Sequence, residues 1–153
     1  MIGLLQRVTQ AEVSVAGETV GRIGRGLMVL VAVHRDDTEK DIARLAARLL
    51  GYRVFPDEDG RMNLSVRDID GGLLLVPQFT LTADTKKGTR ASFTRGAAPD
   101  KASAFFDQLV TACCRELDTV ETGRFGADMQ VALTNDGPVT FWLDTRSGSV
   151  WGQ

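Results

Sequence analysis

The chain has 153 residues, of which 25% are charged and 43% hydrophobic, ordinary proportions for one globular domain. Its formal net charge of −2 argues against a protein that coats long stretches of nucleic acid. The longest apolar run, residues 27–33, is far shorter than the ~20 residues of a membrane-spanning helix, and the first residues do not resemble a signal peptide. We therefore expect a cytoplasmic protein with no membrane contact.

The first third of the chain predicts β-strands. Residues 4–17 alternate apolar and polar side chains, which is typical of a sheet with one solvated face. Glycines punctuate a short strand around residues 17–21, and the apolar run from Gly26 predicts a fully buried strand. A helix should follow, because Thr38 and Asp41 have capping-box spacing and Gly51 follows a run of apolar residues at helical intervals.

The second half predicts a buried strand, a helix and two closing strands. Residues 71–81 are an apolar run interrupted by Pro77, which lacks an N–H group and so belongs at an edge, a bulge or the mouth of a site. A helix should begin near Pro99, and residues 128–136 and 137–145 predict strands. We expect an α+β fold: a small, antiparallel, barrel-like sheet with two packed helices, formed by residues 1–145 and followed by a tail, 146–153.

Common catalytic and metal-binding signatures are absent. Cys113 and Cys114 are adjacent and His34 is the single histidine, so a four-ligand zinc site is excluded and neither a metal nor a cofactor is expected. We interpret Cys113 and His34 as packing residues, since no nucleophile motif accompanies the histidine. The acidic stretch 57–60 lacks the later ligands of a calcium loop and predicts a turn.

Three segments have polar residues that packing alone does not explain. Residues 77–80 (PQFT) place an amide and a hydroxyl inside an apolar run, where each is costly to bury unpaired. Residues 135–140 (NDGPVT) place a Gly-Pro step between apolar strands, and residues 85–96 hold four basic side chains and no acid. A bulge, a hairpin turn and a solvated loop would also account for them. Composition alone indicates at most a small anionic ligand.

These segments resemble the D-aminoacyl-tRNA deacylase family, and the similarity extends over nearly the whole chain. The residues that carry it are LLQRV from Leu4, GYRVF from Gly51, MNLSV from Met62, PQFTLTADTKKG from Pro77, SFTRGAAPD from Ser92, TGRFGADMQV from Thr122 and NDGPVTFWL from Asn135. The resemblance implies a homodimer with an active site at each subunit interface. It also implies hydrolysis of the ester that joins a D-amino acid, or mischarged glycine, to the 3′ end of tRNA.

The resemblance implies how L-amino acids are rejected. Gly137–Pro138 should be a cis peptide that one subunit inserts into the active site of the other, with Arg7 bracing it. A glycine lets the backbone approach the substrate closely, and a proline makes the step rigid. Rejection by backbone would leave glycine, which has no side chain, as a substrate.

The reaction that the resemblance implies suggests roles for the remaining site residues. Backbone N–H groups around Phe79 and Thr80 would stabilise the developing oxyanion, and Gln78 would hold the terminal adenosine or its ribose. Thr80 has no base near it in sequence, so we expect it to position the substrate while the 2′-hydroxyl of the RNA helps to activate water. Phe79 and Met129 would line the adenine pocket. Three basic residues would meet phosphates of the acceptor end: Lys86, Lys87 and Arg90.

One position departs from the family pattern. The commoner motif begins with serine where this chain has Pro77, and an animal relative that edits L-alanyl-tRNA also has proline there. The continuation NDGPVTFWL follows the D-specific pattern, so we interpret Pro77 as a tolerated variant. An L-alanyl-tRNA deacylase and a non-catalytic module that binds the tRNA 3′ end stay open as alternatives.

Overall fold

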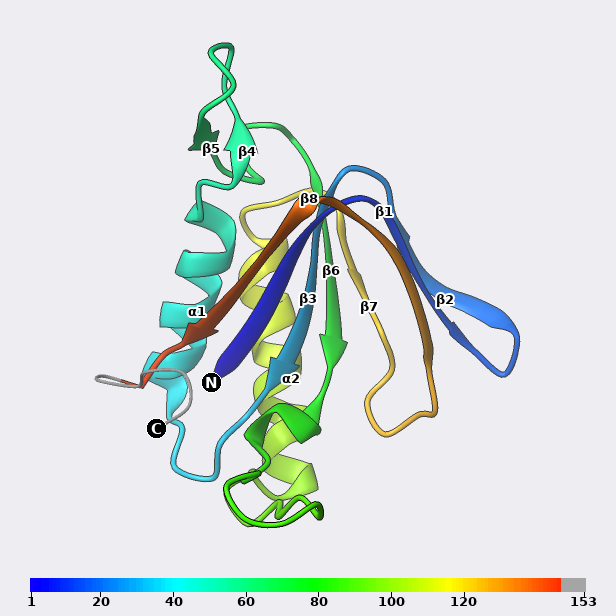
Figure 1. Ribbon diagram of the computed structural model, residues 1–153, viewed down its shortest axis with the longest axis vertical. Coiled ribbons are helices and arrows are strands. Elements are labelled where there is room, and N and C mark those ends of the chain that lie inside the picture. The colour runs from blue at the N-terminus through cyan, green and yellow to red at the C-terminus, as the bar shows by residue number, and fades with distance from the viewer. Residues whose placement is uncertain (147–153) are drawn as a thin grey trace.

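The computed structural model describes residues 1–146, and its elements follow one another along the chain as labelled in Figure 1. They are β1 (Ile2–Val15), β2 (Glu18–Ile23), β3 (Gly26–Ala32), α1 (Glu39–Gly51), β4 (Phe55–Pro56), β5 (Met62–Leu64), β6 (Gly72–Pro77), the 3₁₀ turn η1 (Phe79–Thr82), α2 (Pro99–Cys114), β7 (Val120–Thr122) and β8 (Gln130–Asp144). The predicted tail lies outside the described residues except for Arg146.

The sheet is mixed, and this corrects the expectation of a wholly antiparallel one. Its order is β2-β1-β3-β6-β7, with β8 along β1. β1 is antiparallel to β2, β3 and β8, whereas β3–β6 and β6–β7 are parallel pairs. The parallel pairs arise because a helix crosses over between their strands, α1 before β6 and α2 before β7. The predicted α+β class is confirmed, and the strongly curved sheet is close to barrel-shaped (Figure 1).

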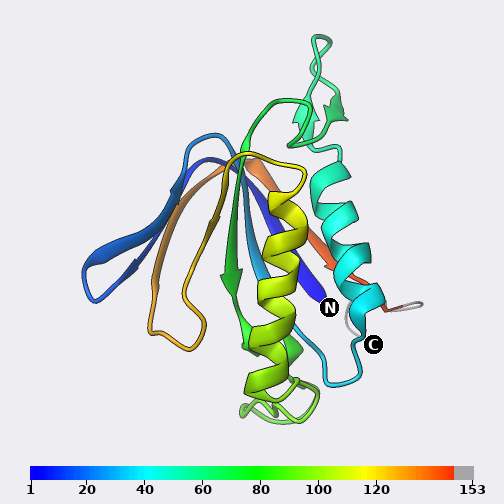
Figure 2. The same ribbon diagram turned by 180° about the vertical axis from the view of Figure 1, so that it is seen from behind.

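The two helices lie side by side on one face of the sheet, as both views show (Figures 1 and 2). The larger hydrophobic core lies between the helices and the sheet, and it includes Leu27 and Val29 from β3. A smaller core fills the concave face, where Met28 of β3 meets Leu74 of β6. Burial on both faces explains why these two strands are continuous apolar runs in the sequence.

Both helices begin where the sequence predicts. The backbone N–H of Thr38 donates to Asp41 Oδ2 (2.8 Å), closing the expected capping box, and α1 ends at Gly51. α2 has Pro99 in its first turn, where the missing N–H costs no hydrogen bond. No helix among residues 1–146 is long and apolar enough to cross a membrane.

Two local predictions were wrong. The strand predicted over residues 71–81 ends at Pro77, and the chain then forms η1. The two closing strands are a single strand, β8, with Gly137–Pro138 inside it instead of in a hairpin turn. A Gly-Pro step is locally a turn signal, but pairing with β1 on both sides of it keeps the chain extended.

Thr145, for which the sequence suggested no role, connects the two ends of the described chain. Its hydroxyl accepts a hydrogen bond from the buried α-ammonium group of Met1 (2.6 Å) and donates to Asp41 Oδ1 (2.6 Å). The same ammonium group forms a buried ion pair with Asp37 (2.7 Å). Burial acts to raise the pKa of Asp41, but hydrogen bonds from Thr145 and Thr38 outweigh it and lower that pKa to about 2.

Candidate active site

The turn after β6 exposes the first group of predicted site residues. Pro77 is the last residue of the strand, and the N–H of Gln78 still donates to the carbonyl of Val31 (2.7 Å) before the chain leaves the sheet. Phe79 and Thr80 then lie in η1, where the Phe79 side chain is 61% exposed and its ring packs edge-on against Phe93, 5.2 Å between centroids. The sequence thus places an aromatic ring and a hydroxyl in solvent directly beyond a buried strand.

Within this turn the side chains of Gln78 and Thr80 bind each other. The Gln78 amide Nε2 donates to Thr80 Oγ1. An amide N–H group cannot accept a proton, so this contact orients the hydroxyl without activating it as a nucleophile. The buried Thr82 donates to the Phe79 carbonyl (2.8 Å) and fixes the turn from below.

Met129 and Pro77 both lie against Gly123, beside the same turn. A Cβ on Gly123 would lie 2.8 Å from Met129 Sδ and 3.4 Å from Pro77 Cδ, so a larger residue there would require the Met129 side chain to move. The Gly123 N–H donates to Leu75 O (2.8 Å), which holds this segment against β6. The structure therefore places Met129 at the Pro77 end of the sheet, and its expected role in an adenine pocket stays a prediction.

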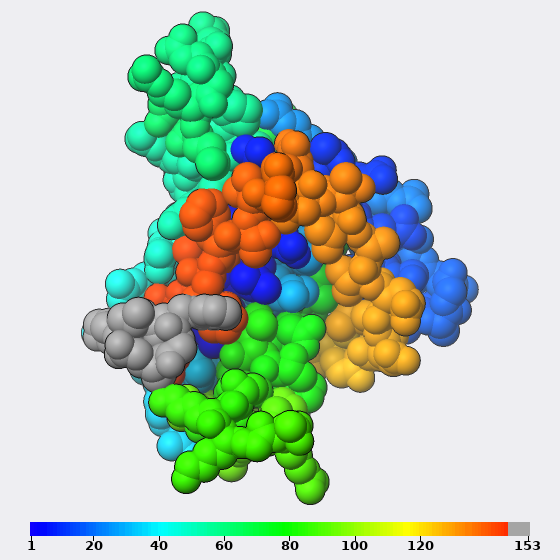
Figure 3. Space-filling model, viewed as in Figure 1, coloured from blue at the N-terminus to red at the C-terminus, as the bar shows by residue number. Residues whose placement is uncertain are grey.

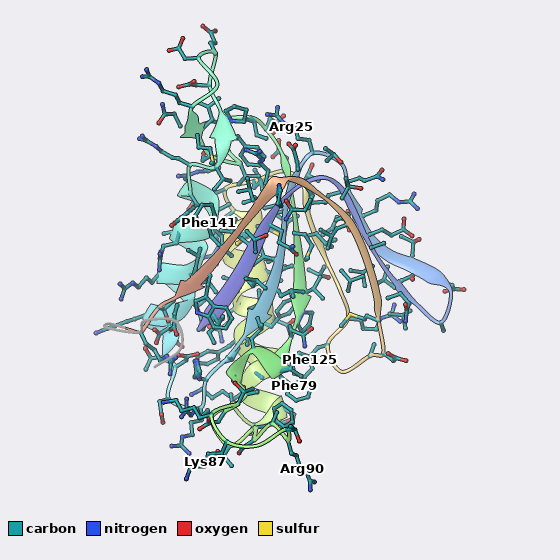
Figure 4. The ribbon with its side chains drawn as sticks, viewed as in Figure 1. Arg25, Phe79, Lys87, Arg90, Phe125 and Phe141 are labelled. Carbon is teal, nitrogen blue, oxygen red and sulfur yellow. The ribbon has the colours of Figure 1, made fainter. Side chains whose placement is uncertain are left out.

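A cleft that the sequence did not indicate adjoins Gly123. Its volume is about 490 Å³, and it lies between α2, β2 and the segment that follows β7; its lining includes Phe106, Arg124 and Phe125. Phe125, labelled in Figure 4, lies on the segment that follows β7. Residues from three segments that are distant in sequence form the cleft, so no local motif predicts it. Of the motifs that carry the family resemblance, only the run TGRFG contributes to its lining.

Residues 85–96, the basic loop, form a compact loop that is closed by hydrogen bonds. Asp84 and Ser92 exchange two backbone hydrogen bonds (2.7 and 3.0 Å), and Asp84 also forms an ion pair with Arg95 (2.7 Å). We therefore assign Arg95 to holding the loop closed and not to binding phosphate. The three predicted phosphate-binding side chains are exposed: Lys86, Lys87 and Arg90. Figure 4 shows Lys87 and Arg90 projecting from the end of the molecule below Phe79.

The Gly-Pro segment forms a wide bulge opposite Arg7. In the β1–β8 ladder Gln6 pairs with Thr140 and Val8 with Asn135, so Arg7 alone faces the four residues 136–139. The Gly137–Pro138 peptide is cis, as the resemblance implied, and both residues are exposed. Gly137 has φ +149°, and a Cβ there would lie 2.6 Å from Val139 Cγ2.

Arg7 holds this bulge from the neighbouring strand. Its Nε donates to the carbonyl of Asp136 (2.8 Å), and its Nη1 donates to the carbonyl of Val54, after α1 (2.7 Å). The Arg7 side chain is only 13% exposed and lies 3.5 Å from the Asp136 carboxylate. This geometry matches the bracing contact that the resemblance implied.

Within a single chain, the turn at residues 78–82 (the Gln78 turn) lies far from the bulge at residues 136–139. Pro77 pairs with Val31, and Val31 pairs with Gly3, four residues along β1 from Arg7. At about 3.3 Å per residue, the bulge lies ~13 Å further along the sheet than the Gln78 turn, before any sideways separation is added. In Figure 3 the green residues around η1 and the orange residues of β8 occupy different parts of the face.

The residues interpreted as packing groups are buried. His34 is 5% exposed, and burial and the nearby Arg146 lower the pKa of its imidazole, which keeps it neutral. Burial also raises the pKa of Cys113 to about 12, so its thiol is not a nucleophile, while Cys114 is exposed. Among residues 1–146 no cluster of three His, Cys, Asp or Glu side chains is arranged to hold a metal ion.

Comparison with known proteins identifies the family that the chain matches. The family model described as D-Tyr-tRNA(Tyr) deacylase matches residues 4–144. A protein of Alkalilimnicola ehrlichii named D-aminoacyl-tRNA deacylase is 62% identical over 146 residues, covering 95% of this chain and 97% of its own. A protein of the same name from Citrobacter koseri is 57% identical over 143 residues, covering 94% of this chain and 99% of its own.

Solved structures share the fold. One described as c-Myc DNA Unwinding Element Binding Protein has a TM-score of 0.92 at 36% identity, and the match covers 96% of this chain and all of that one. Another, described as a probable eukaryotic D-amino acid tRNA deacylase, has a TM-score of 0.80 at 21% identity and covers 93% of this chain and 97% of its own.

Proposed function

The chain belongs to the D-Tyr-tRNA(Tyr) deacylase family, and from this premise we propose that it is a trans-editing hydrolase of mischarged tRNA. Its substrates are D-aminoacyl-tRNA and glycyl-tRNA, and its reaction is hydrolysis of the ester at the 3′-terminal adenosine. The observation that carries the proposal is the exposed Gly137–Pro138 bulge, which Arg7 holds through the Asp136 carbonyl. A fixed backbone segment contacts the substrate at its α-carbon and not at its side chain. Such a contact suits an enzyme that accepts many D-residues and rejects L-residues.

The functional unit in this proposal is a homodimer. Within one chain the bulge and the Gln78 turn are separated along the sheet by about 13 Å, too far for both to contact one aminoacyl group. A second copy that presents its bulge at this turn closes the site. The strand β8, which carries the bulge, also exposes apolar side chains at Val131 and Phe141, and these favour burial against a partner.

The Gln78 turn supplies the chemistry. The first N–H groups of a helical turn have no carbonyl partner inside it, so those of Phe79 and Thr80 are suited to stabilise the oxyanion that forms when water attacks the ester. Thr80 accepts a hydrogen bond from Gln78 and keeps its own proton free to donate to the substrate. The 2′-hydroxyl of the terminal ribose then helps to activate the water.

The RNA end is held beside this turn. Phe79 offers an exposed aromatic face and Met129 an apolar one for the terminal adenine. Lys86, Lys87 and Arg90 extend from the adjoining loop toward acceptor-end phosphates. These few contacts reconcile tRNA binding with the net charge of −2.

Hydrolysis of matched aminoacyl-tRNAs tests the proposal. Purified protein is mixed with D-tyrosyl-, L-tyrosyl- and glycyl-tRNA, and release of the amino acid is followed over time. Cleavage of the D and glycyl esters with the L ester intact is expected. Cleavage of L-tyrosyl- or L-alanyl-tRNA at a comparable rate would favour the L-specific alternative and implicate Pro77. Binding of tRNA without any hydrolysis would overturn the assignment as an enzyme.

A further inference from the structure

The bulge that carries Gly137 and Pro138 is attached at two places. At its first residue, Arg7 binds the Asp136 carbonyl from β1. At its base, the side chain of Asn135 reaches across the opening and binds the residues that follow Pro138. The second attachment belongs to β8 itself, so it sets the width of the bulge independently of the neighbouring strand.

Asn135 uses both ends of its amide. Its Oδ1 accepts from the backbone N–H of Val139 (2.7 Å), while its Nδ2 donates to the Val139 carbonyl (3.3 Å) and to Thr140 Oγ1 (3.0 Å). The Val139 N–H can only donate, so the atom that faces it must be the oxygen, and this fixes which way the amide points. Of the uncharged side chains, only an amide offers an acceptor and a two-proton donor together.

The bulge needs such a clamp because it interrupts the ladder. Thr140 pairs with Gln6 and Asn135 with Val8, so the register with β1 omits Val139. Val139 is nevertheless buried, and a buried backbone N–H without a partner is costly. Asn135 supplies the missing partner and at the same time joins residue 135 to residue 139 across the base of the bulge.

We propose that Asn135 is a positioning residue for chirality: its amide fixes the width of the bulge and thereby the placement of the Gly137–Pro138 backbone against the substrate. The inference rests on the proposed deacylase function. A screen made of backbone discriminates by where its atoms lie, and a displacement of about 1 Å is enough to change rates ~100-fold. Releasing the clamp lets the backbone move away from an L side chain, so selectivity falls.

The test compares D- and L-tyrosyl-tRNA hydrolysis by Asn135→Ala, Asn135→Asp and Thr140→Val. Asn135→Ala removes all three contacts and is expected to lower the ratio of kcat/KM for the D over the L substrate at least ~10-fold, with little change in KM for tRNA. Asn135→Asp keeps the acceptor for Val139 and should retain more selectivity. Thr140→Val removes only the outermost contact and should retain most.

Asn63, the only other asparagine, provides the matched control. Its amide also donates and accepts, to Asp57 Oδ2 (2.8 Å) and from Arg53 (3.1 Å), but these partners flank β4 and do not belong to β8. Asn63→Ala should leave the D-to-L ratio unchanged.

Each outcome of this comparison decides the proposal. A folded Asn135→Ala with the wild-type ratio overturns it, as does an equal fall in Asn63→Ala. If Asn135→Ala does not fold, unchanged ratios in both Asn135→Asp and Thr140→Val overturn it. A wild-type protein that does not cleave D-tyrosyl-tRNA contradicts the proposed function instead, so the two failures are distinguishable.

Discussion

The Gln78 side chain donates a hydrogen bond to the hydroxyl oxygen of Thr80, two residues further along the turn. A nucleophilic threonine needs the opposite arrangement, in which a base accepts the hydroxyl proton. The single histidine is buried and neutral at another place in the fold. The turn therefore presents an oriented hydroxyl donor, which suits contact with the substrate better than covalent attack on it.

The first prediction concerns Thr80. In Thr80→Ala, kcat for D-tyrosyl-tRNA should fall by about 10- to 100-fold while tRNA binding is retained, because a positioned donor is lost but the backbone N–H groups and the 2′-hydroxyl stay. Thr80→Ser should recover most of the rate. Single-turnover hydrolysis measures both variants. Complete loss of activity in both would indicate that this hydroxyl takes part in the chemistry directly.

Gly137 gives a second prediction. A Cβ at this position would lie 2.7 Å from the backbone nitrogen of Val139, and its φ of +149° is unfavourable for any other residue. Gly137→Ala should therefore displace the bulge and lower kcat/KM for the D substrate by about 100-fold.

Gly17 is the control for that variant, because it also has a positive φ (+80°) but no atom within 4 Å of its Cβ position. Gly17→Ala carries the backbone strain without the crowding. It should cost about 1 kcal/mol of stability and leave hydrolysis unchanged. Wild-type activity in Gly137→Ala would contradict the screening role of this backbone.

The sequence predicted the helices well because their signals are local. Thr38, Asp41 and Pro99 act within one turn of the helix that they begin, whatever the rest of the chain does. Parallel pairing of β3 with β6 could not be read in the same way. It depends on where a crossover helix returns the chain, and a buried apolar run fits either direction.

The sequence predicted the motifs of the candidate site one by one, but not how they are arranged in space. PQFT, the basic loop and NDGPVT are each visible as short runs, and resemblance to a family connected them. The contacts of Asn135 across the bulge follow only from the β1–β8 register, and the cleft beside Gly123 follows from three segments that meet in space. Neither has a period or a spacing that the sequence alone reveals.

Thr145 provides a prediction about stability. Thr145→Val keeps the shape of the side chain but removes the hydroxyl that binds the Met1 ammonium group and Asp41, so unfolding at pH 7 should require about 1–3 kcal/mol less. Thr111→Val is the control, since its hydroxyl binds only a carbonyl on an exposed face of α2. Urea denaturation compares the two, and equal losses would contradict a special role for Thr145.

The same contact determines the response to acid. The Asp41 pKa is lowered from 3.8 to about 2, so this carboxylate contributes stability above pH 3.8 that is lost as the pH falls toward 2. Without the Thr145 hydroxyl the pKa of Asp41 should move back toward 3.8. The difference in unfolding free energy between wild type and Thr145→Val should therefore narrow between pH 4 and pH 2. A constant difference over this range would show that Asp41 does not mediate the effect.

The basic loop gives the last prediction, which concerns salt. Arg90 is exposed beyond the Asp84–Ser92 closure, whereas Arg95 is already paired with Asp84. If Arg90 contacts a tRNA phosphate, Arg90→Ala should weaken tRNA binding and reduce the slope of log Kd against log salt concentration by about 0.7–0.9. Arg61→Ala removes the same charge from an exposed position between β4 and β5, at the opposite end of the molecule from the loop (Figure 1). Filter binding over a range of NaCl concentrations compares the two variants. An equal change in slope for both variants would show that tRNA binding depends on the net charge of the protein and not on this loop. A change confined to Arg90→Ala would place the acceptor-end phosphates beside the Gln78 turn.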